Sequence, residues 1–238
     1  MNREYAEYLL KKTKKDYNLI AQDFSRTRAF VPEDFKNWLI QYVFSGEKVL
    51  DWGCGNGRFY ELFQDYSVDY YGVDISEKMI EIAKTQYPKA KFQVVDPLSL
   101  PFPNNFFDKV FSFAVFHHIP SEEFRLQFLK EAKRILKPGG LLILTVWNLN
   151  PLKMILFGEW KRFLRFLKYL ILKISGRSKL DSKDFYLPWG NICLRYIHYF
   201  TKNELKNLAE KSNFRLKEIG ILKSQKTKES NIYLIAEK

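Results

Sequence analysis

The stretch that decides the fold is Val49-Leu-Asp51-Trp-Gly53-Cys-Gly55-Asn-Gly57-Arg-Phe59. An apolar run ends in Asp51, glycines follow at alternate positions, and a helical pattern begins at about Arg58. A glycine-rich turn between a strand and a helix lets a ligand approach bare backbone. The stretch therefore predicts a small-molecule site at the carboxyl end of a strand.

The glycine spacing and the acid distinguish this turn from a nicotinamide-nucleotide loop. Such loops have the spacing G-x-G-x-x-G, whereas the third glycine here, Gly57, comes one residue early. Asp51 would repel a pyrophosphate and attract an ammonium group. The turn thus favours a ligand that carries a positive charge.

On the carboxyl side of the turn, apolar runs alternate with helical patterns in the manner of βαβ units. Strands are expected at 48–52, 69–74, 91–96, 109–115 and 141–147, with helices at about 58–65, 76–86 and 121–136. A further helix is expected from Thr201, where Glu204 completes a capping box, and two strands follow at about 214–222 and 231–236. This order predicts a Rossmann-like α/β fold, a mostly parallel seven-stranded sheet with helices on both faces.

Three of the expected strands end in an acid. Asp51, Asp74 and Asp96 come at the ends of the first three strands, and Asp74 follows Gly53 by 21 residues, where such sheets hold a carboxylate for ribose hydroxyls. One strand-terminal Asp is usually a turn residue. Three at the same edge of a sheet, beside the glycines, predict a nucleoside-containing ligand.

Four stretches resemble successive motifs of the class I S-adenosylmethionine (AdoMet)-dependent methyltransferases. They are VLDWGCGNGRF at 49–59, YYGVDIS at 70–76, VVDPLSLPF at 94–102 and LKPGGLLILTV at 136–146. The resemblance covers about 47–148 and implies AdoMet as cofactor, with its ribose on Asp74 and its adenine amino group on Asp96. The donor-binding residues implied are Asp51, Gly53, Cys54, Gly55, Gly57, Asp74, Ile75, Asp96, Pro97, Ala114 and Val115.

Methyl transfer from a sulfonium is an in-line displacement, so the enzyme must chiefly align the acceptor and exclude water. His117 and His118 follow the fourth strand and are candidate general bases for a neutral acceptor, although such histidines also serve in donor packing. The only cysteines, Cys54 and Cys193, form no ligand pattern with the histidines. We expect no metal and no disulfide.

The chain is strongly basic, with 39 Lys and Arg against 27 Asp and Glu, a net charge of +12. Between 151 and 180, eight cations face Glu159 alone, which places +7 of the +12 there: Lys153, Lys161, Arg162, Arg165, Lys168, Lys173, Arg177 and Lys179. Apolar residues interleave with them over about 154–174. Three interpretations stay open: a helix capping the cleft, a tRNA phosphate site, and peripheral contact with an anionic membrane.

Further segments resemble the tRNA wobble-uridine methyltransferases that esterify a 5-carboxymethyl group. They are Tyr17 to Arg28, AVFHH at 114–118, LPW at 187–189, RYIHYF at 195–200, and the Glu204-Leu205 pair. Eukaryotic members depend on a small zinc-binding partner and have a Glu-Arg-Arg run where this chain has Glu122-Glu123-Phe124-Arg125. Whether this chain needs such a partner stays open.

The narrower resemblance implies a carboxylate acceptor in tRNA. A carboxylate is ionised at neutral pH and needs an orienting cation more than a base. Arg28 and Arg195 are the candidates for that role, together with His117 and His118 as candidate catalytic residues. The alternatives are a methyltransferase for a small molecule such as a quinone, lipid or metabolite, and a non-catalytic AdoMet-binding module.

We expect N-terminal helices over 1–46 that cover the donor site and a methyltransferase domain over 47–238, with a basic helical insertion at about 150–185. The first residues lack the apolar region of a secretory signal. The longest charge-free run, 138–152, is shorter than the roughly 18 residues of a membrane span. These features predict a cytoplasmic protein.

Overall fold

The computed structural model describes residues 1–149, 155, 159–223 and 230–238. Its helices are α1 (Arg3–Thr27), α2 (Glu33–Leu39), η1 (Ile40–Tyr42), α3 (Tyr60–Gln64), α4 (Glu77–Gln86), η2 (Phe116–His118), α5 (Glu122–Ile135), α7 (Trp160–Ile174) and α8 (Lys202–Lys211). Its strands are β1 (Lys48–Trp52), β2 (Asp69–Asp74), β3 (Lys91–Val94), β4 (Phe107–Phe113), β5 (Leu136–Trp147), β6 (Asp184–Trp189), β7 (Cys193–His198), β8 (Arg215–Lys223) and β9 (Ser230–Glu237). No helix in the described ranges is both long enough and apolar enough to cross a membrane.

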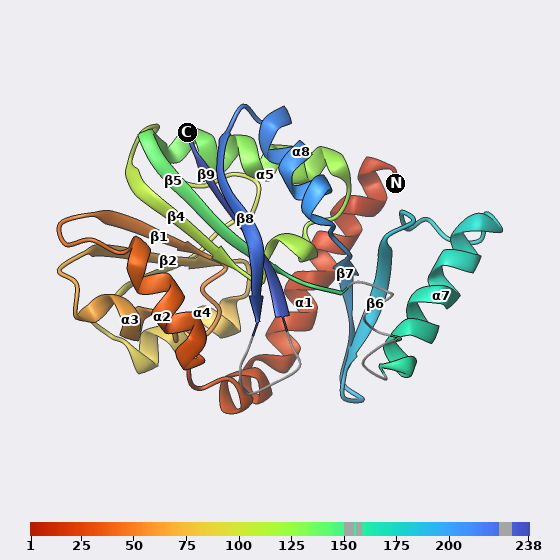
Figure 1. The fold of residues 1–238 in the computed structure, drawn as a ribbon. Helices are drawn as coiled ribbons and strands as arrows, with labels where there is room; N and C mark the ends of the chain where they lie inside the picture. Colours follow the sequence, from red (N-terminus) through yellow and green to blue (C-terminus); the bar gives the residue numbers. More distant parts are fainter. Residues whose placement is uncertain (150–154, 156–158, 224–229) are drawn as a thin grey trace.

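Seven strands form one sheet in the order β3-β2-β1-β4-β5-β9-β8 (Figure 1). The strands from β3 to β5 pair in parallel, and β9 runs antiparallel to both β5 and β8. The Rossmann-like fold is therefore confirmed. Because the order reverses between β1 and β4, their carboxyl ends open a crevice where such sheets bind ligands.

Helices cover both faces of the sheet because side chains alternate along each strand. Leu50 and Trp52 of β1 point into a core formed with α1, α5 and α8, where the Trp52 ring stacks on Phe128 at 3.7 Å. Val49 points into a second core formed with α2, α3 and α4. The cores fix β1 from both sides and so fix the turn that follows it.

Three helices begin directly after a hydroxyl residue that caps them. Ser76, Ser121 and Thr201 each accept a hydrogen bond from a backbone amide three residues later. The predicted capping box at Thr201 is only half formed, however. The Glu204 carboxylate accepts from Lys183 and contacts His198 instead, because a charge-assisted hydrogen bond is stronger than one to a neutral backbone amide.

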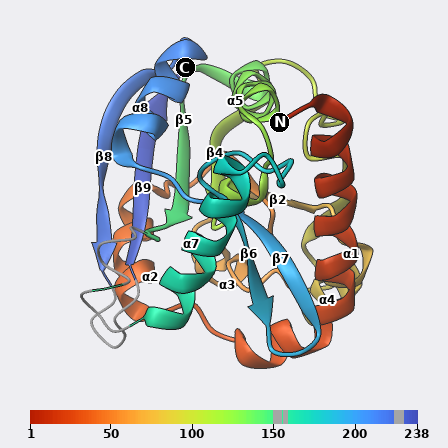
Figure 2. The ribbon, with the colours of Figure 1, turned by 90° about the vertical axis from the view of Figure 1, so that its right-hand side faces the viewer.

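Two strands that the sequence did not predict follow the expected helical insertion at about 150–185. Residues of β6 and β7 pair as an antiparallel ribbon, with Leu187 opposite Arg195. The ribbon lies between α1 and α7 (Figure 2). The prediction missed it because both strands are short and Pro188 disfavours a strand assignment. The expected start of the amphipathic helix near Met154 lies outside the described residues, and α7 covers the rest.

Candidate active site

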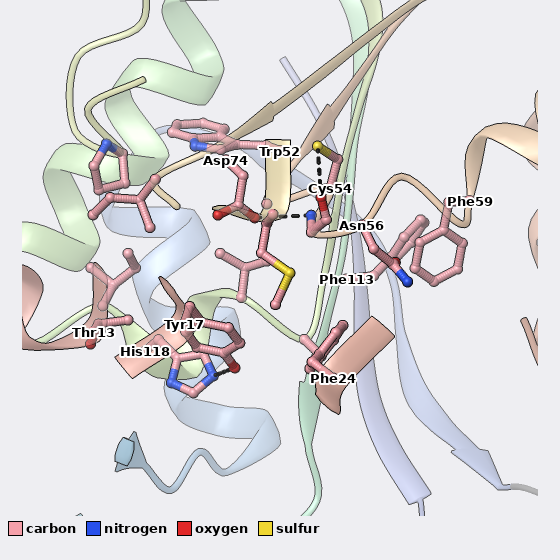
Figure 3. Close-up of a pocket in the computed structure, with 18 of the residues that line it drawn as sticks. Thr13, Tyr17, Phe24, Trp52, Cys54, Asn56, Phe59, Asp74, Phe113 and His118 are labelled. Carbon is pink, nitrogen blue, oxygen red and sulfur yellow. Dashed lines mark hydrogen bonds between the residues drawn. The ribbon is translucent and has the colours of Figure 1, made fainter. Parts of the chain in front are cut away.

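A cavity lies at the carboxyl ends of β1, β2 and β4, beneath α1 (Figure 3). We call it the glycine-loop cavity. The predicted residues that line it are Gly53, Cys54, Gly55, Asp74, Ile75, Pro97, Ala114, Val115, His118 and Arg28. The turn after β1, the end of β2 and the segment after β4 thus meet at one place, at the carboxyl ends of the strands, where open α/β sheets bind ligands.

Backbone geometry shapes the loop. Gly53 has φ +87°, and a Cβ added there would lie 2.2 Å from the Val115 Cγ2, so a side chain would collide with the opposite wall. Asp74 accepts from the Gly55 amide at 2.9 Å and from the Ser76 amide at 2.8 Å. Since a carboxylate oxygen accepts more than one hydrogen bond, Asp74 is oriented by the backbone and can still accept from a ligand.

Asp51 is buried at the end of β1 with an uncompensated charge. Its Oδ2 accepts from the Tyr70 hydroxyl at 2.9 Å, whereas its Oδ1 is buried without a partner among the described residues. Burial raises the pKa of Asp51 to about 7, and the nearby charge of Asp74 adds to the rise, although the Tyr70 bond opposes it. A buried carboxylate with a free oxygen fits a cationic group of a ligand.

Three predicted donor residues, Asp51, Gly57 and Asp96, lie outside the cavity lining. Gly57 serves packing, because a Cβ there would lie 2.8 Å from the Phe92 Cζ. Asp96 is exposed, and its Oδ1 accepts from the Leu98 amide at 2.7 Å. Its side chain is therefore engaged in its own turn, although Val95 and Pro97 on either side do line the cavity.

Sequence reasoning missed several lining residues: Trp52, Asn56, Met79, Val95, Phe113 and Trp147. Three of them end a strand, Trp52 in β1, Phe113 in β4 and Trp147 in β5, so their places at the carboxyl edge of the sheet could have identified them. No sequence signal identifies which side chains of α1 reach the cavity. Thr13, Tyr17 and Phe24 do so and cover its open side (Figure 3).

His118 lines the cavity with both ring nitrogens engaged. Its Nδ1 donates to the Tyr196 carbonyl at 2.8 Å, so its Nε2 is the acceptor for the Tyr17 hydroxyl at 2.7 Å (Figure 3). Burial, with the charge of Arg195, lowers the pKa of His118 to about 3. A neutral imidazole with an occupied acceptor is poorly suited to take a proton from an acceptor molecule.

His117 lines neither the glycine-loop cavity nor the second cavity that adjoins it. It is fully buried, and the Trp147 amide donates to its Nδ1 at 3.5 Å. Burial lowers the pKa of His117 well below its usual value, and the neighbouring His118 adds to the effect. Its surroundings therefore match a packing role better than proton transfer.

A second, basic cleft continues from the glycine-loop cavity, and the two share Arg28, Arg58, Phe59, Phe113, Ala114 and Trp147. Among the residues that the structure describes, seven cationic side chains line it against one acid, Glu159: Arg26, Arg28, Arg58, Lys161, Arg162, Arg165 and Arg195. The basic segment is thus divided. Lys161 and Arg165 of α7 face the cleft, whereas Lys168 lies outside its lining.

The two predicted arginines meet on one indole. The guanidinium carbon of Arg28 lies 4.3 Å from the Trp189 ring centre, and that of Arg195 lies 4.7 Å from it. Arg195 is only 6% exposed, and its Nε and Nη1 are buried without hydrogen-bond partners among the described residues. A buried guanidinium with unused donors is suited to a planar anion such as a carboxylate.

Comparisons with known proteins agree with this geometry. A family model described as a methyltransferase domain matches residues 50–144. A tRNA (carboxymethyluridine(34)-5-O)-methyltransferase from Schizosaccharomyces pombe is 30% identical over 250 residues, which cover 93% of this chain and 94% of the relative. An Arabidopsis thaliana enzyme of the same name is 34% identical over 149 residues, 60% of this chain, and the match spans only 34% of that relative.

A solved structure shares the whole architecture at low identity. It is the complex between a Haloferax volcanii methyltransferase and the Trm112 methyltransferase activator. The TM-score is 0.64 at 16% identity, over 92% of this chain and 97% of that chain. At that identity the likeness concerns the fold.

Proposed function

The chain belongs to the family of tRNA (carboxymethyluridine(34)-5-O)-methyltransferases, and from this membership we propose that it methylates the carboxylate of a carboxymethylated wobble uridine in tRNA. It is an AdoMet-dependent methyltransferase. The identity of the methyl acceptor, and the residues that hold the acceptor and AdoMet, are what we propose.

The glycine-loop cavity is the proposed donor site. AdoMet, when bound, supplies an electrophilic methyl group on a sulfonium. Asp51 does not itself line the cavity, but it directly precedes the lining residues Trp52 and Gly53, and its free Oδ1 is the proposed partner of the ammonium of the methionine part. Asp74, which lines the cavity and is oriented by two amides, matches the ribose hydroxyls. The bare backbone at Gly53 and Gly55 gives the ligand room. Asp96 is a weaker candidate for the adenine because its carboxylate is exposed.

Arg195 carries the acceptor proposal. Its buried guanidinium keeps two unused nitrogens at the wall of the basic cleft, close to where that cleft joins the glycine-loop cavity. Trp189 and Trp147 flank it, with ring centres 4.7 and 5.2 Å from its guanidinium carbon. A buried guanidinium with two unused donor nitrogens is costly, so an ionised carboxylate that accepts from both is the ligand that best compensates it.

This acceptor needs alignment more than proton transfer. A carboxylate is already ionised at neutral pH and attacks without a base once it is held in line. The low pKa of His118 and its occupied Nε2 agree with that chemistry. We propose that Tyr17 and His118 act together to hold α1 over the donor and exclude water.

The cations at the mouth of the cleft are proposed to bind tRNA phosphates. Lys161 and Arg165 lie on α7, and Arg26 lies at the end of α1, across the cleft from them. Contacts from both walls would follow a single-stranded loop that enters between them. Binding of this kind weakens with added salt.

The test is mass spectrometry of nucleosides from tRNA that carries 5-carboxymethyluridine, after incubation with the protein and labelled AdoMet. We expect a labelled methyl ester on that nucleoside. Because a structural relative was solved with its activator, the reaction is run with and without the Haloferax volcanii activator. The absence of ester in both reactions, alongside methylation of a quinone or another small acceptor, would overturn the proposal.

A further inference from the structure

A cluster of buried charges joins the ribbon to the main sheet on the side away from the basic cleft. Its centre is His198, near the end of β7, which is 3% exposed. The His198 Nδ1 lies 2.6 Å from Asp184 Oδ1, and its Nε2 lies 2.9 Å from Glu204 Oε1. We call His198, Asp184, Glu204 and Arg125 the anchor cluster.

His198 lies between two acidic side chains, one at each ring nitrogen. Although burial opposes it, the contacts with His198 and Lys183 lower the pKa of Glu204 to about 2. The Asp184 side chain is fully buried. The His198 ring is therefore held from both sides, by β6 at Nδ1 and by α8 at Nε2.

The anchor cluster connects four elements. Asp184 belongs to β6, His198 to β7, Glu204 to α8 and Arg125 to α5. The Arg125 Nη2 lies 3.6 Å from Asp184 Oδ1, and its Nε donates to the Ile119 carbonyl at 3.0 Å. The charges thus tie both strands of the ribbon to helices that pack on the main sheet.

Alternation along β7 relates this cluster to Arg195. Tyr196 and His198 share one face of the strand, and Arg195 lies on the other. The Tyr196 carbonyl accepts from His118, and its hydroxyl accepts from Arg125 at 3.2 Å. Arg195 itself lacks a hydrogen-bond partner at Nε and Nη1 among the described residues, so its place depends on how the ribbon is held.

We infer that His198 is a positioning residue: its ring, bonded to Asp184 and Glu204, fixes the ribbon onto the core and so holds Arg195 at the basic cleft. The inference rests on the proposed function for its effect on the acceptor, but its effect on the ribbon stands apart from that function. A His198 variant still leaves Arg125 3.6 Å from Asp184 and Lys183 2.8 Å from Glu204, so neither carboxylate loses every cationic partner. Losing His198 should therefore loosen the ribbon more than it unfolds the protein.

The test compares His198→Gln with Leu205→Ala in the full chain. Leu205 is buried on the same helix as Glu204, so its truncation destabilises the fold without removing a charge. Hydrogen exchange of amides 184–198 reports on the ribbon without any acceptor. Calorimetry with AdoMet and steady-state kinetics with carboxymethylated tRNA report on the two sites.

We expect faster exchange across the ribbon in His198→Gln and little change in Leu205→Ala. The KM for tRNA should rise about tenfold or more, as expected for a group moved by an ångström or so, while the Kd for AdoMet stays within about twofold. Should His198→Gln fail to fold, Glu204→Gln removes one negative charge from the anchor cluster and keeps Asp184, and the same readings apply.

Unchanged ribbon exchange in a folded variant would overturn the inference, as would equal ribbon exchange in Leu205→Ala. If wild-type protein methylates no tRNA but the ribbon still loosens in His198→Gln, the proposed acceptor is wrong and the anchor is supported. If wild-type protein methylates tRNA and His198→Gln leaves the KM unchanged, the acceptor stands and the positioning role fails.

Discussion

The glycine-loop cavity and the basic cleft adjoin, yet they are built in different ways. The cavity is shaped mainly by the backbone: amides of Gly55 and Ser76 orient Asp74, and the lack of a side chain at Gly53 leaves space for a ligand. The cleft is formed mainly by side chains, and Arg28 and Arg195 come together in it from distant parts of the chain. Donor recognition is therefore local in sequence, whereas acceptor recognition depends on tertiary structure.

The largest effect should come from the cleft. Replacing Arg195 with Ala removes the cation proposed to hold the acceptor carboxylate, and losing one partner of a buried charged pair costs about 2–5 kcal/mol. We expect kcat/KM for carboxymethylated tRNA to fall by about 30- to 4000-fold. Calorimetry should find the AdoMet affinity unchanged.

The matched control is Arg195→Lys, which keeps the charge but not the planar pair of donors. It should recover only part of the activity. A loss of AdoMet affinity as large as the loss of activity would mean that the two sites are not separable.

The next effect belongs to the cavity. Asp74→Ala removes the carboxylate proposed to accept from the ribose, and hydrogen bonds to charged groups contribute about 1.5–3 kcal/mol. The Kd for AdoMet should rise by about 10- to 150-fold. Tight binding of NADH, with none of AdoMet, by the wild-type protein would contradict the donor assignment altogether.

The pH dependence of donor binding tests the buried acid. Asp51 has a pKa raised to about 7, and a cationic ligand binds the ionised form better. The affinity for AdoMet should therefore fall as the pH decreases through about 7, by up to about tenfold at pH 6, and stay level just above 7. Titration calorimetry on wild type and Asp51→Asn checks this, because the variant should bind weakly with a flat profile over the same range.

A smaller effect separates the cations of α7 that line the cleft from those that do not. The double variant Lys161→Ala, Arg165→Ala loses two proposed phosphate contacts, so the slope of log affinity for tRNA against log salt should decrease by about 1.4. The control is Lys168→Ala, Lys173→Ala, which removes equal charge outside the cleft lining. Equal slopes in the two double variants would show that overall charge, and not the cleft, attracts tRNA.

The same contrast explains what sequence could predict. The glycine turn, the strand-end acids and the order of strands follow from local patterns, and the structure agrees with them at Gly53, Gly55 and Asp74. The exposure of Asp96 could not be predicted, because it depends on a side-chain turn closed by the Leu98 amide.

The other features that the sequence could not predict depend on contacts between distant segments of the chain. Arg28 and Arg195 were predicted through a resemblance, but nothing in their spacing predicts that both guanidinium groups contact the ring of Trp189. The engagement of His118 by Tyr17 and Tyr196 joins three distant segments, so its low pKa could not be anticipated. The capping box at Thr201 is only half formed because of a tertiary contact too, since the Glu204 carboxylate contacts His198 of another element.

The most direct test is whether Arg195 recognises the carboxylate of the acceptor. The measurement is the affinity of wild type and Arg195→Gln for two tRNAs, one with 5-carboxymethyluridine and one with the finished methyl ester, at the same salt concentration. We predict that wild type prefers the acid by roughly tenfold or more, because only the acid pairs with the guanidinium, and that Arg195→Gln binds both alike. A preference for the acid that persists undiminished in Arg195→Gln would contradict the account.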